Sequence, residues 1–251
     1  MLILIKKGLI KMKIITVYNA KGGVWKTSII HNLGYSLSNM GYKVLMIDLD
    51  QQASLTISCG IEPDKAVYTS YNFLTDNKIC LKPINLKNNL DLLPSDLQLS
   101  LLDKTLIQLK NQSIILKRRL IEVGFYDYIL IDTPPALSAI SANAVYACDL
   151  LLSPIDCSYL SYVGLKTVED TVKKFNKKID GIVATRYNQR TTDSKTIVNL
   201  LEKKYNLVGK ISESVKAKEA LYYGVPIVEY MPKHKISNQY IDLAKNIIRS
   251  C

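Results

Sequence analysis

The sequence of 251 residues is poor in the features that mark metal-rich, membrane-spanning or repetitive proteins. Its five cysteines include no C-x-x-C pair, which argues against a zinc ribbon and gives no support to an iron–sulfur site. No apolar run approaches the roughly 18–20 residues of a membrane span. No repeat, low-complexity tract or linker divides the chain. The odd number of scattered cysteines suggests a reducing cytoplasm.

Arginine is also scarce, with five arginines among 33 basic residues. The formal net charge is nevertheless +11 and the sequence pI is about 9.3. A basic balance of this size favours a polyanionic partner, either nucleic acid or an anionic membrane surface. A lysine-rich proteome would give the same excess without any such partner.

The first residues, MLILIKKGLIKMK, place apolar residues before lysines, which is the reverse of a secretory signal. Met12 directly precedes the first predicted strand. Residues 1–11 are therefore either an N-terminal extension or an artefact of start-site choice, and we expect residues 12–251 to form a single domain.

Apolar runs alternate with segments of helical periodicity, which predicts an α/β fold with a mostly parallel, twisted sheet flanked by helices. The predicted strands are Ile14–Tyr18, Val44–Ile47, Leu90–Leu93, Tyr128–Ile131, Leu150–Pro154, Ile179–Ala184 and Leu207–Ile211. The predicted helices are Ser28–Asn39, Leu97–Val123, Ala139–Tyr146, Ser161–Asn176, Asp193–Tyr205 and Asn238–Ile248. Residues 60–90 predict only loops with short helices.

The segment Lys21-Gly22-Gly23-Val24-Trp25-Lys26-Thr27-Ser28 lies between the first predicted strand and the first predicted helix. Glycines let backbone N–H groups approach an anion, and a helix N-terminus adds unpaired donors and partial positive charge. Lys26 is expected to reach the terminal phosphates of a nucleotide, and the Thr27 hydroxyl to bind Mg²⁺. The segment predicts a phosphate-binding loop (P-loop) for ATP or GTP. An ordinary glycine-rich turn would need neither Lys26 nor Thr27.

Carboxylates follow two other predicted strands, at the edge where parallel sheets bind ligands. Asp48 and Asp50 follow the second strand; Asp50 is suited to orient an attacking water, and Asp48 to organise the Mg²⁺ shell or the P-loop lysine. A helix-capping role is the alternative for Asp50. Asp132 ends an apolar strand in the Walker B manner and is expected to hold Mg²⁺.

Together these segments resemble the ParA/MinD ATPases, whose deviant Walker A motif carries an additional lysine, here Lys21. Further stretches of ParA-type partition ATPases are resembled by the segments Met46–Thr56, Leu90–Ser95, Tyr222–Ile227 and Asn238–Ala244. The resemblance covers nearly the whole chain from Met12 onward and implies a P-loop NTPase fold of the deviant Walker A type.

The resemblance implies a homodimer that forms on ATP binding, in which Lys21 of each subunit reaches the other's phosphates and Asp50 positions the water. The dimer is expected to bind nonspecific DNA, and a ParB-like centromere-binding partner to stimulate hydrolysis. The implied DNA contacts are Arg190, Lys216 and Lys218, with Lys245 and Arg249 as weaker candidates. Each of these is also explained as a solvated surface cation. The implied location is the cytoplasm, on the nucleoid, with no membrane.

Trp25 departs from the motif, which has glycine before the lysine. Its indole either obstructs the nucleotide, or the residue is already helical and its side chain points outward, over the adjacent surface or the dimer interface. We favour the second interpretation because every polar phosphate- and metal-binding residue is retained. Alternative functions are a MinD-like membrane-cycling protein and a regulator whose hydrolysis Trp25 impairs. An iron-protein reductase of the same fold would need paired cluster cysteines.

Overall fold

A computed structural model describes residues 12–76, 78, 80–106 and 112–250. The predicted extension, residues 1–11, lies outside the described residues. The strands are β1 (Lys13–Val17), β2 (Val44–Asp48), β3 (Ile84–Lys87), β4 (Leu90–Leu93), β5 (Tyr128–Asp132), β6 (Leu150–Asp156), β7 (Gly181–Thr185) and β8 (Leu207–Lys210). The helices are α1 (Lys26–Asn39), α2 (Ser54–Ser58), α3 (Ser70–Thr75), α4 (Leu99–Leu106), α5 (Ile115–Ile121), α6 (Ala139–Ala147), α7 (Tyr159–Lys173), α8 (Thr192–Lys204), α9 (Val215–Leu221), α10 (Ile227–Tyr230) and α11 (Lys235–Ser250). Two 3₁₀ turns are η2 (Pro63–Lys65) and η3 (Gln112–Ile114).

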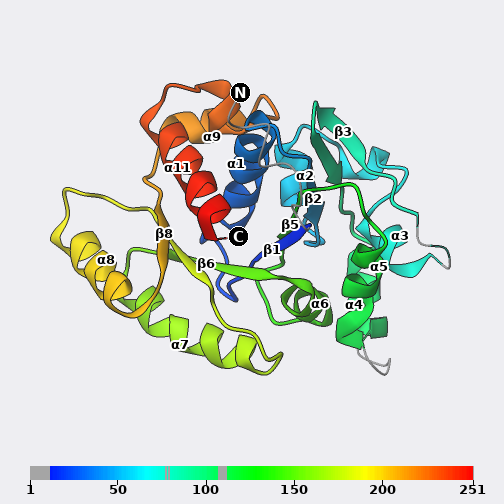
Figure 1. The fold of residues 1–251 in the computed structure, drawn as a ribbon, viewed down its shortest axis with the longest axis horizontal. Coiled ribbons are helices and arrows are strands. Elements are labelled where there is room, and N and C mark those ends of the chain that lie inside the picture. The colour runs from blue at the N-terminus through cyan, green and yellow to red at the C-terminus, as the bar shows by residue number, and fades with distance from the viewer. Residues whose placement is uncertain (1–11, 77, 79, 107–111, 251) are drawn as a thin grey trace.

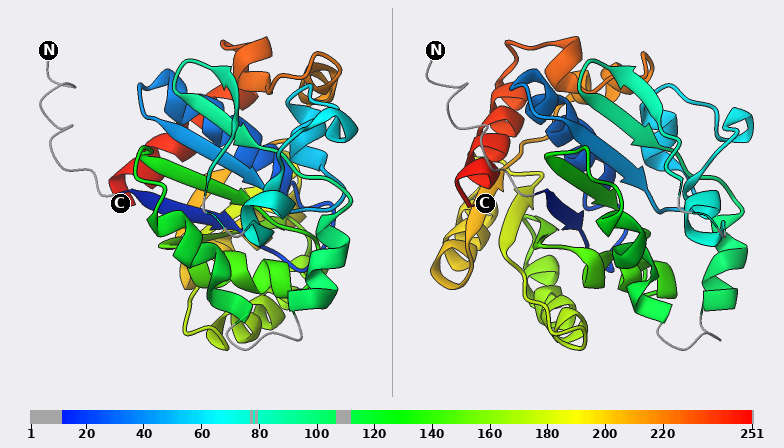
Figure 2. Two further views of the ribbon diagram at one scale, coloured as in Figure 1. Left: turned by 90° about the vertical axis from the view of Figure 1, so that its right-hand side faces the viewer. Right: turned by 45° about the vertical axis from the view of Figure 1, so that its right-hand side comes forward.

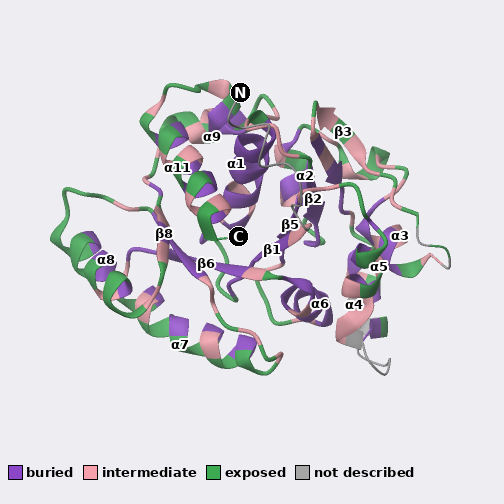
Figure 3. Ribbon diagram, viewed as in Figure 1, coloured by how far each residue is buried: buried purple, intermediate pink, exposed green. Residues whose placement is uncertain are grey.

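The strands form one eight-stranded sheet in the order β3-β4-β2-β5-β1-β6-β7-β8, with helices on both faces (Figure 1). All seven predicted strands are present and pair in parallel; β3, which we did not predict, pairs antiparallel with β4 at one edge. The central strands β1, β2 and β5 are buried almost throughout, as Figure 3 shows, because helices cover both of their faces. Figure 2 shows the helical layers on either side of the sheet.

One face of the sheet is covered by α1, α10 and α11, and the other by α4, α5, α6 and α7, with α8 beside α7. α11 packs along α1 and β8 through its buried residues Ile236, Tyr240, Leu243, Ala244 and Ile247. The helix that begins at the P-loop is therefore itself covered by the last helix of the chain.

The single helix predicted over Leu97–Val123 is wrong. α4 ends at Leu106, and η3 and α5 begin a separate segment, with residues 107–111 outside the described residues. Both helices pack beside α6, and the Asn143 side chain accepts a hydrogen bond from the Leu116 backbone N–H in the first turn of α5. Two short helices bury their apolar faces around α6 in a way that one straight helix of this length would not.

A candidate nucleotide site at the C-terminal edge of the sheet

The P-loop joins the end of β1 to the start of α1, as predicted. Asn19 fixes its first residues: the Asn19 amide donates to the Pro154 carbonyl over 2.8 Å and accepts from the Lys21 N–H over 2.9 Å. Gly23 has φ of 72°, in the left-handed region that glycine adopts without strain. Val24 is buried and anchors the far side of the loop.

Lys26 lies at the first position of α1, and its side chain curls back so that Nζ donates to the Lys21 carbonyl over 3.3 Å. Burial lowers the pKa of its ammonium, while the carboxylates of Asp132 and Asp50 raise it. The charge is thus held in a partly desolvated position among anions, where phosphate oxygens would interact with it strongly.

Thr27 and Asp132 are brought into direct contact. The Thr27 hydroxyl donates to Asp132 Oδ2 over 2.6 Å, and Asp132 Oδ1 accepts from the Thr133 N–H over 3.1 Å. Burial, and then the nearby Asp48 carboxylate, raise the pKa of Asp132 well above its ordinary value. A cation at this point would relieve the cost of that buried charge, so the pair fits the Mg²⁺ role predicted for it.

Asp48 is completely buried behind Asp132, with which it is in register across the β2–β5 pair. Both of its oxygens are occupied: Oδ1 accepts from the Asp50 N–H, and Oδ2 from the backbone and hydroxyl of Thr56. The geometry favours the organising role, because Asp48 holds the loop that carries Asp50. Within the described part of the chain, no group of three or more His, Cys, Asp or Glu residues is arranged to hold a metal ion.

Asp50 faces the open cavity beside the P-loop. That cavity has a volume of about 560 Å³ and is also lined by Gly22, Gly23, Lys26 and Thr27. Asp50 Oδ1 accepts from the Gln52 N–H over 3.0 Å, while the N-cap of α2 is Ala53, so Asp50 closes a turn before the helix instead of capping it. The structure thus brings Lys26, Thr27 and Asp50 to one cavity, and Asp132 lies behind its wall, bonded to Thr27.

Lys21 points away from Lys26 and pairs with its own chain. Its Nζ donates to Asp156 Oδ2 over 3.0 Å and to Ser161 Oγ over 2.8 Å. Burial raises the pKa of Asp156, but hydrogen bonds from Ser161, Lys21 and Ser158 outweigh it and leave the pKa below its ordinary value. Asp156 is therefore a stable counter-charge for Lys21.

Comparison with known proteins assigns this chain to a family. Residues 12–185 match the model of an AAA domain family. The sporulation initiation inhibitor protein Soj of Bacillus subtilis (strain 168) is 34% identical over 247 residues, which cover 94% of this chain and 98% of Soj. The chromosome partitioning protein ParA of Caulobacter vibrioides (strain NA1000 / CB15N) is 30% identical over 253 residues, covering 94% of each chain.

The chain belongs to the ParA/MinD family of P-loop ATPases. Among solved structures, a putative plasmid partition protein of Borrelia burgdorferi B31 bound to AMPPNP superposes with a TM-score of 0.83. It is 29% identical, and the match covers 96% of this chain and 100% of that one. The predicted family and fold class are confirmed.

Trp25 is where this ParA/MinD-type loop is unusual. Its φ is 70° and its ψ 29°, so the prediction of a helical Trp25 is wrong. The backbone keeps the left-handed conformation that suits glycine, which costs an L-residue roughly 1–2 kcal/mol. The half-buried indole lies beside the loop, with the Arg186 guanidinium 5.9 Å from its ring centroid. Arg186 also donates to the Gly23 carbonyl over 3.1 Å and, more weakly, to Asp156 Oδ2 over 3.4 Å.

None of the three predicted DNA contacts lines the phosphate cavity, although Lys218 lines an adjoining cavity together with Trp25. Arg190 is exposed in the loop between β7 and α8, and Lys216 and Lys218 are exposed on α9. Both lysines are paired: Lys216 with Glu219 over 2.7 Å and Lys218 with Glu213 over 3.2 Å. Exposed pairs of this kind contribute little energy, so phosphates of a polyanion would displace the glutamates readily.

Sequence reasoning missed Asn19, Asp156, Ser161 and Arg186. Asp156 had a usable signal, because it ends an apolar strand in the same way as Asp132. Arg186 had none, since it follows β7 by one residue and reaches Gly23 only through the fold.

Proposed function

We propose that this ATPase binds ATP with Mg²⁺ in the cavity beside Lys26 and Thr27 and uses the nucleotide to drive DNA segregation. The observation that carries the nucleotide site is the 2.6 Å contact between Thr27 and Asp132 beside the partly buried Lys26. It places a hydroxyl and a carboxylate together, at the start of a helix whose first N–H groups are free for phosphate oxygens. Bound Mg²⁺ would be held by Thr27 and Asp132 and would neutralise charge on the phosphates.

In this proposal Lys26 holds the phosphates and Asp50 orients the attacking water. Lys21 leaves Asp156 when two ATP-bound subunits meet, and each Lys21 binds the phosphates of the partner subunit. This exchange replaces an ion pair of Lys21 within one chain by one between chains, so ATP and dimerisation are coupled. A homodimer then carries two copies of every exposed cation.

The DNA half of the proposal rests on the relatives and on charge. Soj and the Caulobacter and Borrelia proteins carry names of sporulation, chromosome-partitioning and plasmid-partition proteins, and this chain has a net charge of +11. We infer that Arg190, Lys216 and Lys218 contact nonspecific DNA in the dimer. A ParB-like partner would stimulate hydrolysis, and the protein would act in the cytoplasm on the nucleoid.

Among the described residues, none of the helices combines the length and the apolar character needed to span a bilayer. A membrane-cycling protein would instead bind lipid through an amphipathic helix whose apolar face is uncovered. The amphipathic helix α11 uses its apolar face against α1 and β8, so that face is not available to a lipid surface.

The deciding experiment is co-sedimentation with DNA and, separately, with anionic liposomes, each with ATP, ADP or no nucleotide. The proposal expects DNA binding only with ATP and no liposome binding. ATP-dependent liposome binding without DNA binding would replace it with the membrane-cycling function.

A further inference from the structure

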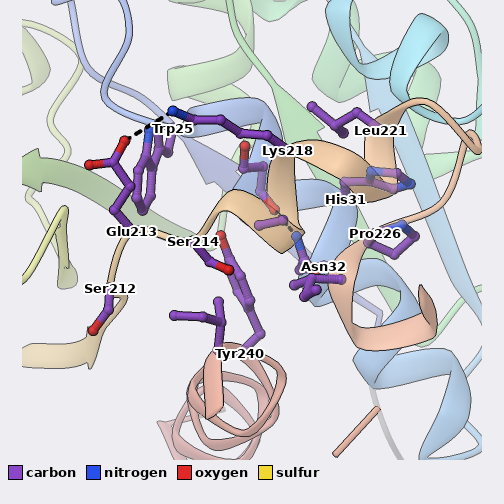
Figure 4. A pocket seen from close by; sticks show the side chains of 14 residues that line it. Trp25, His31, Asn32, Ser212, Glu213, Ser214, Lys218, Leu221, Pro226 and Tyr240 are labelled. Carbon is purple, nitrogen blue, oxygen red and sulfur yellow. Dashed lines mark hydrogen bonds and ion pairs between the residues drawn. The ribbon is translucent and has the colours of Figure 1, made fainter. Parts of the chain in front are cut away.

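A second, partly open cavity adjoins the phosphate cavity. It has a volume of about 80 Å³ and lies between α1, α9 and α11, as Figure 4 shows. Three residues, Trp25, Ser28 and Leu221, line both cavities. A ligand whose phosphates occupy the P-loop would therefore reach the second cavity by passing Ser28, on the first turn of α1.

The walls of this cavity combine apolar surface with a few polar groups, which is typical of a small-molecule subsite. Ile227, Ile236 and Tyr240 are buried and line it from α10 and α11. His31 lines it from α1, is 1% exposed, and its Nε2 has no hydrogen-bond partner in the described structure. A buried ring nitrogen without a partner is costly, so a ligand atom that bonds it would be favoured.

Trp25 supplies a flat surface at the junction. The Arg186 guanidinium lies 5.9 Å from the indole centroid, and the half-buried Trp25 is also one of the residues that line the cavity. Aromatic rings stack on nucleobases because every base has a π-face. Inorganic phosphate offers no such face.

The rim of the cavity carries a carboxylate beside an ammonium, from Glu213 and Lys218, 3.2 Å apart (Figure 4). The Glu213 carboxylate is a hydrogen-bond acceptor. Adenine presents the N6 amino donor to such a group, whereas guanine presents an acceptor, O6, at the same position.

We propose that this cavity is the nucleobase end of the nucleotide site, that the Trp25 indole is the surface on which an adenine base packs, and that the Glu213 carboxylate selects adenine over guanine. The proposal deepens the proposed function and rests on it. It assigns Trp25 a role that a glycine at this position cannot perform. The unusual residue then contributes to base recognition and does not obstruct the phosphates.

The test compares ATP with inorganic triphosphate, which has the phosphates but no base, by calorimetry on the full chain with Mg²⁺. Trp25→Gly is the main variant, because glycine accepts a φ of 70° and the loop should keep its shape. We expect this variant to bind ATP about tenfold more weakly and inorganic triphosphate with unchanged affinity. Thermal unfolding of the variant checks that it is folded.

The only tryptophan of the chain gives a second readout. ATP should change the Trp25 fluorescence, whereas inorganic triphosphate at saturation should change it much less. Glu213→Gln should narrow the preference for ATP over GTP, with Glu62→Gln, another exposed glutamate that pairs with a lysine, as the matched control.

Equal losses of ATP and triphosphate affinity in Trp25→Gly, or no loss of either, would overturn the proposal. A wild-type chain that binds triphosphate as tightly as ATP would overturn it while leaving the phosphate site intact. A wild-type chain that binds neither ligand would instead refute the proposed function itself.

Discussion

Lys21 donates a hydrogen bond to Asp156 of its own chain, with Nζ 3.0 Å from Oδ2. Ser161 accepts a second bond from the same ammonium, and Arg186 reaches the same carboxylate oxygen from the other side. The signature lysine of the loop is thus paired before any second subunit arrives.

Asp156→Asn should free Lys21 earlier and so favour the ATP-bound dimer. The lysine side chain of this pair is 51% exposed, so the pair contributes little to folding, and the variant should unfold at nearly the wild-type temperature. Analytical ultracentrifugation with ATP should show dimers at a protein concentration several-fold lower than wild type requires. A dimerisation constant equal to that of wild type would show that the Asp156 contact does not restrain Lys21.

Lys26→Ala should abolish ATP binding, because the phosphate charges would lose their partly buried counter-charge. Equilibrium binding of a labelled ATP measures the effect directly. Lys43→Ala is the matched control, because Lys43 is exposed and directly precedes β2. It therefore lies at the N-terminal ends of the parallel strands, whereas the P-loop lies at their C-terminal ends. Nucleotide affinity that survives in Lys26→Ala would remove this lysine from the site.

Asp50→Ala should bind ATP with near wild-type affinity and hydrolyse it at least about 100-fold more slowly, because orientation of the water acts in the transition state. Phosphate release measures turnover, and gel filtration should show a persistent ATP dimer. Asp64→Ala, at an exposed position in η2, is the control. Normal turnover in Asp50→Ala would leave Asp50 with only its turn-forming bond to Gln52.

Replacing Arg190, Lys216 and Lys218 by alanine should weaken ATP-dependent binding to every DNA sequence alike. Phosphate contacts release counterions, so each lost contact should lower the slope of log affinity against log salt by roughly 0.9. The control removes three exposed lysines, Lys173, Lys174 and Lys203, from the C-terminal ends of α7 and α8. If both triple variants lose the same DNA affinity and salt dependence, DNA binding depends on the net charge alone. Arg190, Lys216 and Lys218 would then have no specific role in it.

His31 should make the nucleotide-free protein sensitive to acid. Burial lowers the pKa of His31 to about 3 from an ordinary 6.5. Between these two pH values, His31 is therefore protonated in the unfolded chain and neutral in the folded chain. The free energy of unfolding is therefore unaffected by His31 above pH 6.5 and decreases as the pH falls towards 3. The decrease is about 2 kcal/mol at pH 5. Urea unfolding at pH 7.5 and pH 5 measures the difference, which His31→Leu should reduce by that amount. An unchanged difference would contradict the assignment.

The parallel strands and the residues of the phosphate loop were predictable because their signals are local. A fully apolar run such as that of β5 has few alternatives to a central strand, and Asp132 directly follows it in sequence. β3 was not predictable in the same way: it is a short edge strand, half exposed, and reaches β4 through a turn in which Asn89 has a φ of 62°. Nothing in its pattern separates it from a loop.

Contacts between segments that are distant in sequence could not be predicted from the sequence alone. The bond between Lys21 and Asp156 spans 135 residues, and that between Arg186 and Gly23 spans 163. The backbone of Trp25 was mispredicted for a different reason. The loop geometry imposes the left-handed conformation on whichever residue precedes Lys26, and the helical preference of the tryptophan has no influence there.

The packing of α11 along α1 has a consequence for synthesis on the ribosome. Residues of α1 are made well before the helix that covers them, residues 235–250. Until then, the apolar face of α1 that α11 will cover remains exposed, and contacts this far apart in sequence form slowly. A nascent chain should therefore bind nucleotide firmly only after α11 has left the exit tunnel, so that a chain without α11 competes poorly for ATP.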